Sequence, residues 1–158
     1  MKITLLLVGK TENKNLIALQ EEYIKRVNHY VGFEVIVIPE MRNTKNMTVN
    51  EQKEREGDLI LKYLNANDNV ILLDENGKQY SSEKFAGFLE KKMLESLKRM
   101  VFVVGGAYGF SQQVYKRADA LFSLSEMTFS HQMVRVFFIE QLYRAFTIIN
   151  GEPYHHKG

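Results

Sequence analysis

The stretch VFVVGGAYGF, Val101–Phe110, places four apolar residues directly before three glycines within five positions. The apolar run has the length and β-branched content of a buried strand, and the glycines predict a sharp turn at its end. Two interpretations of Gly105, Gly106 and Gly109 are open. In the first, the glycines only let the chain turn. In the second, they let a ligand lie against bare backbone.

Apolar runs of similar length recur along the chain and predict five strands. The predicted strands are Ile3–Val8, Phe33–Ile38, Val70–Leu73, Val101–Val104 and Ala120–Leu124. Segments with helical periodicity lie between and after them, and the second opens with a capping box of Thr48 and Glu51. The predicted helices are Leu16–Tyr30, Val49–Leu64, Glu83–Leu97, Ser111–Arg117 and His131–Ile149. This alternation predicts an α/β fold, with a mostly parallel sheet and helices on both faces.

Length and composition favour one compact unit. With 158 residues and 45% hydrophobic content, we expect residues 1–158 to form a single domain. The absence of cysteine excludes disulfides, thiolate catalysis and cysteine-based zinc sites, and suits a reducing cytoplasm. The opening MKITLLLVGK is too short for the apolar core of a signal peptide and predicts a first strand. A net charge of only +2 argues against a protein that coats nucleic acid non-specifically.

The last predicted helix is unusually apolar, because 12 of the 17 residues Met133–Ile149 are apolar or aromatic. Such a helix must be buried nearly all round, and Arg135, Glu140 and Arg144 argue against a membrane span. Since one sheet cannot cover both faces of a helix, we expect a homodimer that packs through it. A central helix of a monomer is the open alternative.

The glycines fall at the carboxyl end of a predicted parallel strand, where ligands bind in open α/β sheets. Their G-G-x-x-G spacing is not the dinucleotide fingerprint, and no phosphate-loop Lys-Ser or Lys-Thr pair follows, which disfavours a nucleotide hydrolase or phosphotransferase. Two further loops should reach the same edge: DENGKQYS from Asp74, and SLSEMTFSHQMVRV over Ser123–Val136. Three such loops could enclose a small organic ligand with mainly backbone groups.

Three motifs carry a family resemblance: VGGAYG, LSEMTFSHQMVRVFFIEQLYRA and the terminal GEPYH. Together they closely resemble the RlmH (YbeA-like) family of SPOUT-superfamily methyltransferases. The resemblance implies a homodimer with a C-terminal trefoil knot. It also implies methylation of N3 of a pseudouridine in 23S ribosomal RNA, with S-adenosylmethionine as the methyl donor and no metal.

The same resemblance assigns residues to the methyl-donor pocket. Leu73 and Leu124 would flank the adenine, although each read alone is an ordinary core leucine. Backbone groups of Gly105 and of the loop after Leu124 would form the hydrogen bonds. The full predicted set is Leu73, Gly105, Leu124, Ser125, Glu126, Met127, Thr128 and Phe129.

Predicted catalytic residues surround the last helix. His131 follows the donor loop and could take the proton from N3, or it could be a helix-start residue that bonds backbone. The family implies roles for Arg144, Tyr154 and His155, the first of them across the dimer, and leaves His155 and His156 as alternatives.

The candidates for RNA contact are the basic side chains of Lys116, Arg117, Arg135, Arg144 and Lys157. The plain alternatives are a buried ion pair for Arg135 and a solvated charge for Lys116 and Arg117. Because the charge is modest, the assembled ribosome is the favoured substrate. A non-catalytic ribosome-binding factor with the same fold is the alternative function.

Overall fold

The computed structural model describes residues 1–156 of the chain. Its five strands form one sheet in the order β2-β1-β4-β3-β5, and every neighbouring pair is parallel. The strands are β1 (Lys2–Val8), β2 (Gly32–Ile38), β3 (Asn69–Gln79), β4 (Arg99–Val104) and β5 (Ala120–Ser123). The predicted α/β class with a parallel sheet is confirmed.

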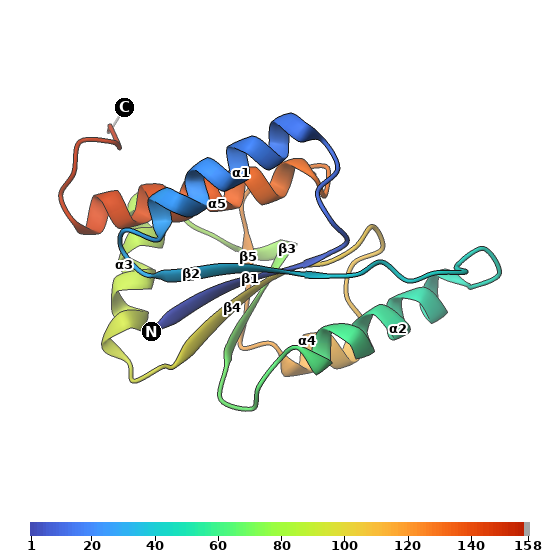
Figure 1. Cartoon of the computed structure of the whole chain (residues 1–158). Helices are drawn as coiled ribbons and strands as arrows, with labels where there is room; N and C mark the ends of the chain where they lie inside the picture. Colours follow the sequence, from blue (N-terminus) through green and yellow to red (C-terminus); the bar gives the residue numbers. More distant parts are fainter. Residues whose placement is uncertain (157–158) are drawn as a thin grey trace.

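Five helices cover the two faces of this sheet, as Figure 1 shows. Helices α1, α3 and α5 lie on one face, and α2 and α4 lie on the other. The helices are α1 (Lys14–Val27), α2 (Val49–Lys62), α3 (Ser82–Leu94), α4 (Gln112–Arg117) and α5 (Met133–Ile149).

Strand β1 shows how the two hydrophobic cores arise from one sheet. Its side chains alternate, so that Ile3, Leu5 and Leu7 join the core under α1, α3 and α5, whereas Leu6 and Val8 join the core under α2 and α4. All five side chains are buried. A strand that is apolar on both sides therefore needs helices on both sides, as in other parallel sheets.

Helix α5 runs along its face of the sheet with α1 and α3 as neighbours (Figure 1). Phe138, Leu142 and Phe146 are fully buried there, which confirms that the helix lies in a core. Its burial is incomplete, however, because Met133 is 39% and Phe137 43% exposed. The first half of α5 therefore presents an apolar strip to the outside.

Local hydrogen bonds explain where the helix ends differ from the sequence prediction. Asn13 accepts hydrogen bonds from the Asn15 and Leu16 amides, so α1 starts two residues earlier than predicted. Asn28 bonds the backbone of Phe33 in both directions, which ends α1 at Val27 rather than Tyr30. The predicted cap Thr48 does accept from the Glu51 amide.

Strand β3 is longer than predicted and irregular. The predicted strand ended at Leu73, whereas β3 continues to Gln79, and both Leu73 and Lys78 pair with Phe122 of β5. Gly77 lies in the intervening bulge, where a Cβ atom would stand 2.6 Å from the Phe122 backbone nitrogen. The bulge and β5 therefore pass each other at backbone contact, which only glycine permits.

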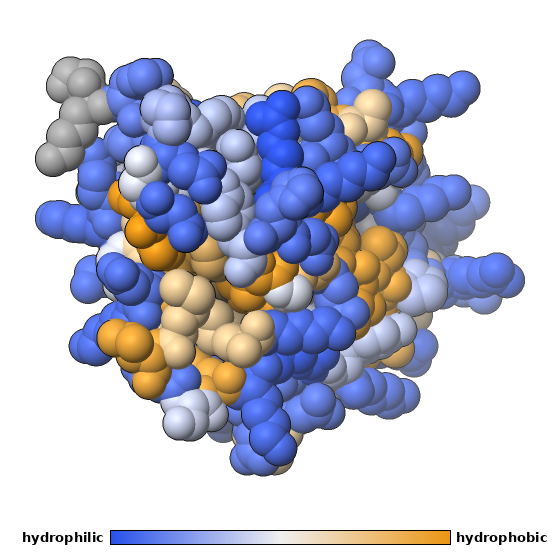
Figure 2. Space-filling model, turned by 60° about the vertical axis from the view of Figure 1, so that its left-hand side comes forward, coloured by the Kyte–Doolittle hydropathy of each residue, from blue (hydrophilic) through white to orange (hydrophobic). Residues whose placement is uncertain are grey.

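The outer surface is largely hydrophilic, with apolar side chains exposed in a band across the face seen in Figure 2. Leu94, at the end of α3, is 85% exposed, more than any other large apolar side chain within residues 1–156. No helix in this described part of the chain is long and apolar enough to cross a membrane.

An ion pair joins the starts of two strands at the amino-terminal edge of the sheet. Arg99 donates to both carboxylate oxygens of Asp68, over 3.0 Å and 2.5 Å, and the Asn65 amide donates to the same carboxylate. Burial alone would raise the pKa of Asp68, but these hydrogen bonds outweigh it and hold the pKa below its ordinary value.

Replacing Asp68 by Asn tests this pair. Because the folded-state pKa is lowered, ionised Asp68 stabilises the fold above its unfolded pKa of about 3.9, and that stabilisation is lost as the pH falls through the folded value. We expect D68N to lose about 1 to 2 kcal/mol of unfolding free energy at pH 7 in urea titrations, since Arg99 is partly solvent-screened. The loss should shrink at pH 3. An equal loss at both pH values, or the same loss in the exposed control D58N, would contradict it.

Candidate functional site

A cavity of about 600 Å³ opens at the carboxyl ends of the strands. Three segments surround it, as the sequence predicts: the bulge of β3, the glycine turn after β4 and the loop between β5 and α5. Its lining includes seven of the eight predicted donor-pocket residues and the predicted catalytic His131. Those eight lining residues are Leu73, Gly105, Leu124, Ser125, Met127, Thr128, Phe129 and His131.

Protein atoms crowd the glycine turn after β4 from two sides: the Phe110 ring, which lines the cavity, and the Glu56 carboxylate, which does not. A Cβ atom at Gly105 would lie 2.9 Å from the Phe110 ring, and one at Gly106 would lie 2.6 Å from a Glu56 carboxylate oxygen. Gly109 has a φ of +80° and closes the turn by donating its amide to the Gly106 carbonyl. The packing of the turn therefore requires these glycines even before a ligand is considered.

Two serines shape the loop between β5 and α5. Ser123 Oγ donates to the Ser125 carbonyl over 2.8 Å, and Ser125 Oγ accepts from the Met127 amide over 3.0 Å. Glu126 is exposed and does not line the cavity, unlike the other predicted residues of this loop. The loop is thus bent by its own side chains toward the cavity.

His131 lies exposed in the turn that precedes α5, which begins at Met133 instead of the predicted His131. Ser130 supplies the local capping bond, because its Oγ accepts from the Met133 amide over 3.1 Å. His131 is therefore not needed as a cap, and its side chain stands at the cavity wall.

Several lining residues had no role in the sequence prediction. Tyr115 of α4 donates a hydrogen bond to Asp74, and burial together with this carboxylate raises the pKa of Tyr115. Lys53 reaches the cavity from α2. Asp74 stood out in the sequence by its place at a strand end, whereas nothing in the pattern of α4 distinguished Tyr115 from an ordinary amphipathic position.

Arg135 occupies a different place from the RNA contact that was predicted. Its side chain is fully buried and donates to the Val8 carbonyl over 2.9 Å and to Thr11 Oγ1 over 3.0 Å. Burial lowers the pKa of this guanidinium, although Glu40 works in the opposite direction. Arg135 thus ties α5 to the segment after β1 and has no surface to offer an RNA phosphate.

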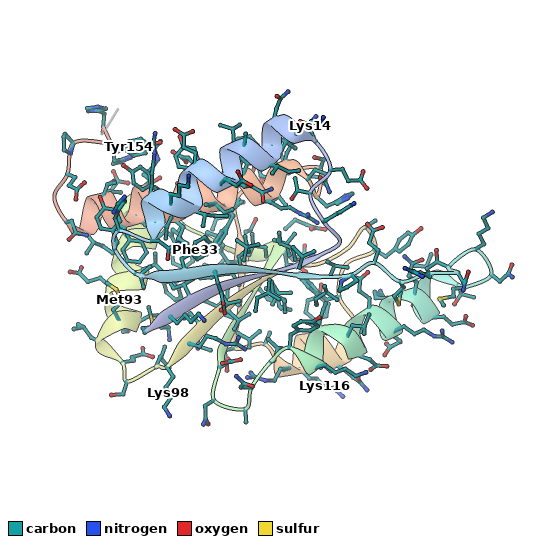
Figure 3. The ribbon with its side chains drawn as sticks, viewed as in Figure 1. Lys14, Phe33, Met93, Lys98, Lys116 and Tyr154 are labelled. Atoms are coloured by element: carbon teal, nitrogen blue, oxygen red, sulfur yellow. The ribbon has the colours of Figure 1, made fainter. Side chains whose placement is uncertain are left out.

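The two basic residues at the end of α4 differ from each other. Arg117 donates to the carbonyls of Asn65 and Asp68 over 2.8 Å and 3.0 Å, so it caps the turn before β3 instead of facing solvent. Lys116 is exposed (Figure 3) and remains available for a contact. Lys157 lies outside the described residues.

The other predicted catalytic residues form a second cluster at the end of α5. Arg144 donates to Glu140 Oε1 over 2.7 Å and contacts His155 Nδ1 at 3.1 Å. Tyr154 donates to the same Glu140 oxygen over 2.9 Å, and the Arg144 guanidinium lies 4.8 Å from its ring centre. Glu140 thus holds Arg144 and the C-terminal segment together.

His155 is oriented by its two partners. Arg144 can only donate, so His155 Nδ1 accepts its hydrogen bond. Nε2 then carries the ring hydrogen and donates to Glu83 Oε1 over 3.0 Å. Upstream in the tail, Glu152 accepts a hydrogen bond from Tyr30 in the turn after α1, and burial with this carboxylate raises the pKa of Tyr30 to about 12. The Tyr154 hydroxyl also lies 3.3 Å from that of Tyr23 in α1. The tail is therefore fixed to α1 and the turn after it, to α3 and to α5. His156 is exposed.

The cavity and this second cluster are separate within one protomer. His131 and Val134 line the cavity at the start of α5, whereas Arg144 lies eleven residues beyond Met133, about 16 Å along the helix axis. Figure 3 likewise shows Tyr154 above the edge where β1 begins, opposite the edge where Lys14 follows β1. One chain alone does not assemble all the predicted catalytic residues.

Within residues 1–156, no three or more histidine, aspartate or glutamate side chains gather in an arrangement that could hold a metal ion. The cavity itself presents backbone groups, apolar walls and a few polar side chains.

Comparison with known proteins gives consistent results. The sequence model of a family described as "Predicted SPOUT methyltransferase" matches residues 1–155. Curated relatives named "Ribosomal RNA large subunit methyltransferase H" are 57% identical in Christiangramia forsetii, 55% in Flavobacterium johnsoniae and 52% in Bacteroides fragilis. Each comparison spans 157 residues, which is 99% of this chain and 100% of the relative.

One solved structure shares the fold at low sequence identity. It is described as a probable methylase family protein from Haemophilus influenzae, with a TM-score of 0.51 and 12% identity. The match covers 94% of this chain and 66% of that chain.

Proposed function

Because the chain belongs to the RlmH family of SPOUT methyltransferases, we propose that it methylates N3 of a pseudouridine in the RNA of the large ribosomal subunit, with S-adenosylmethionine as the donor. The observation that carries this proposal is the cavity at the carboxyl edge of the sheet, lined by the predicted donor residues. We take residues 1–158 to act as a single domain in the cytoplasm, where bacterial ribosomes work.

The residues of the cavity fit such a donor. Its volume of about 600 Å³ is in the range of small-molecule sites. Half-buried Leu73 and Leu124 offer apolar surface for a purine, and the glycine turn offers backbone donors and acceptors. Lys53 on one side and Asp74 and Glu75 on the other place charges of both signs at the lining, which suits a ligand with an ammonium and a carboxylate group.

When bound, S-adenosylmethionine supplies an electrophilic methyl group on a sulfonium centre. The residues of this chain have to hold the RNA nitrogen in line with that group and help its proton leave, because an imide N3–H is a poor nucleophile. His131 is placed for this second task, because it is exposed at the cavity wall and its imidazole can accept a proton.

A homodimer would complete the site. The apolar strip of α5, with Met133 and Phe137, continues into Phe129 of the donor loop, whose ring lies 5.2 Å from that of Phe137. If a second copy packs on this strip with its α5 antiparallel, its tail cluster approaches the cavity. The partner would then supply Arg144, Tyr154 and His155, which lie too far from the cavity in their own chain.

A C-terminal trefoil knot is the finer expectation for the fold. Knots are rare exceptions among protein folds. The family nonetheless implies one for this part of the chain.

RNA recognition should depend more on shape than on charge. Among the described candidates for RNA contact, Arg117 and Arg135 bond within the fold, and Arg144 is held by Glu140 and His155. Lys116 is exposed and has no such bond. A net charge of +2 gives little non-specific attraction to phosphate. We therefore propose the assembled ribosome or large subunit, rather than free RNA, as the substrate.

The direct test is methyl transfer from labelled S-adenosylmethionine to ribosomes, large subunits and naked ribosomal RNA from cells that lack this protein. We expect one methylated pseudouridine in large-subunit RNA, found by mass spectrometry and formed on ribosomes or subunits. A Ser125→Trp variant, which fills the cavity, should be inactive. Ribosome binding without transfer by the wild type would favour the non-catalytic binding factor.

Replacing His131 by Ala tests its role in proton removal. We expect turnover to fall about 100-fold at neutral pH while the Kd for the donor stays within about twofold, because general-base assistance is lost but the cavity walls remain. Recovery at high pH, where N3 ionises unaided, should accompany the loss. His29→Ala, the same change at an exposed position of another segment, is the control. A collapse of donor binding would make His131 a structural part of the loop.

A mixed dimer tests the composite site. Ser125→Trp and His155→Ala are each expected to be inactive as homodimers, whereas a heterodimer isolated through two different tags carries one intact site of two. We expect about half of the wild-type activity from that heterodimer, because each protomer supplies the part that its partner lacks. If the heterodimer is as inactive as its parents, the tail does not act across the dimer.

A further inference from the structure

Glu56 of α2 lies directly behind the glycine turn that lines the cavity. Its side-chain oxygen Oε1 accepts a hydrogen bond from the Gly106 amide over 3.0 Å, and the residue is only 9% exposed. Glu56 itself does not line the cavity. A buried carboxylate therefore braces the far side of a turn whose near side forms the cavity wall.

Close helix packing places Glu56 there. A Cβ atom at the next residue, Gly57, would lie 2.3 Å from Ser111 Oγ, so α2 can approach the start of α4 only because position 57 has no side chain. Gly106 meets the same constraint from the other side, because its Cβ atom would stand 2.6 Å from Glu56 Oε2. The Glu56–Gly106 contact is thus built into the packing of α2.

The charge of Glu56 is not explained by packing. Burial raises the pKa of its carboxyl, the Gly106 amide lowers it and the like charge of Glu40 raises it again. No salt bridge joins Glu56 to a cation within residues 1–156. A buried acid that accepts a hydrogen bond from one backbone amide costs stability, and a role for that amide in the cavity wall would account for the cost.

The orientation has a consequence for the cavity. In a trans peptide the N–H and the preceding C=O point in opposite directions, and the structure contains no cis peptide bond among its described residues. Since the Gly106 N–H points to Glu56, the Gly105 carbonyl points away from α2. Gly105 lines the cavity, so this carbonyl is an acceptor held on the ligand side.

We propose that Glu56 is a positioning residue for the methyl donor: by holding the Gly106 amide, it presents the Gly105 carbonyl to the exocyclic amine of the adenine. This role rests on the proposed function, in which the cavity holds S-adenosylmethionine. The exocyclic amine of adenine donates hydrogen bonds, so it needs an acceptor. A fixed carbonyl therefore binds adenine in preference to a purine that carries an oxygen in place of the amine, because two oxygens cannot form a hydrogen bond with each other.

The experiment compares two ligands by calorimetry: S-adenosylhomocysteine, and S-inosylhomocysteine, in which a carbonyl oxygen replaces the amine. The wild type should prefer the adenosine ligand. Glu56→Met, which keeps the side-chain length but removes the acceptor, should weaken the adenosine ligand about tenfold and the inosine ligand much less. Glu56→Gln, whose amide oxygen still accepts from Gly106, should restore the preference to within about threefold of wild type.

Two further variants keep the result interpretable. Glu54→Met makes the same change at an exposed position of α2 and should leave both affinities unaltered. Gly106→Ala should reproduce the lost preference if Glu56→Met does not fold, because its methyl group displaces the carboxylate.

Three results would overturn the role of Glu56. They are an equal loss for both ligands in Glu56→Met, no loss in that variant, or no rescue by Glu56→Gln. Failure of the wild type to bind either ligand would instead remove the proposed function, and this role with it.

Discussion

The burial of α5 against the sheet and against both α1 and α3 determines where the cavity and the C-terminal cluster lie. Phe138, Leu142 and Phe146 fill the core on that face. The start of the helix then falls beside the donor loop, and its end falls where Glu140 and Arg144 hold the tail. One helix therefore joins the two groups of predicted catalytic residues and also keeps them apart.

The same face explains the position of Arg135. A fully buried guanidinium in an apolar helix is stable only with acceptors, and it finds them at the Val8 carbonyl and Thr11. Val8 ends β1 and Thr11 follows it, so the start of α5 is tied to the carboxyl end of β1. The contact serves the geometry of the cavity even though it offers nothing to RNA.

The glycines of VGGAYG combine both interpretations that the sequence left open. Their backbone does line a cavity, but the atoms that exclude a side chain at Gly105 and Gly106 belong to the protein itself, to the Phe110 ring and the Glu56 carboxylate. The packing of the turn therefore requires these two glycines, and their bare backbone also suits a ligand. Only the structure separates the two causes, because Glu56 belongs to a helix fifty residues earlier in the chain.

Periodicity and position predicted the parallel sheet, the five helices and the three loops around the cavity, because each depends on neighbouring residues. The predictions differ from the structure where residues distant in the sequence determine the conformation. Pairing with β5 extends β3 to Gln79. Arg117 donates hydrogen bonds to the carbonyls of Asn65 and Asp68 instead of facing solvent. The pairing of Tyr115 with Asp74 joins two segments that no local pattern connects.

The position of α5 at the end of the element order also constrains how the chain matures during synthesis. While the nascent chain lacks α5, the sheet face that carries Ile3, Leu5 and Phe102 is covered only by α1 and α3. That groove between two helices stays open to water until α5 has been made. Apolar side chains on this face of the sheet are therefore exposed to aggregation for longer during synthesis than those under α2 and α4.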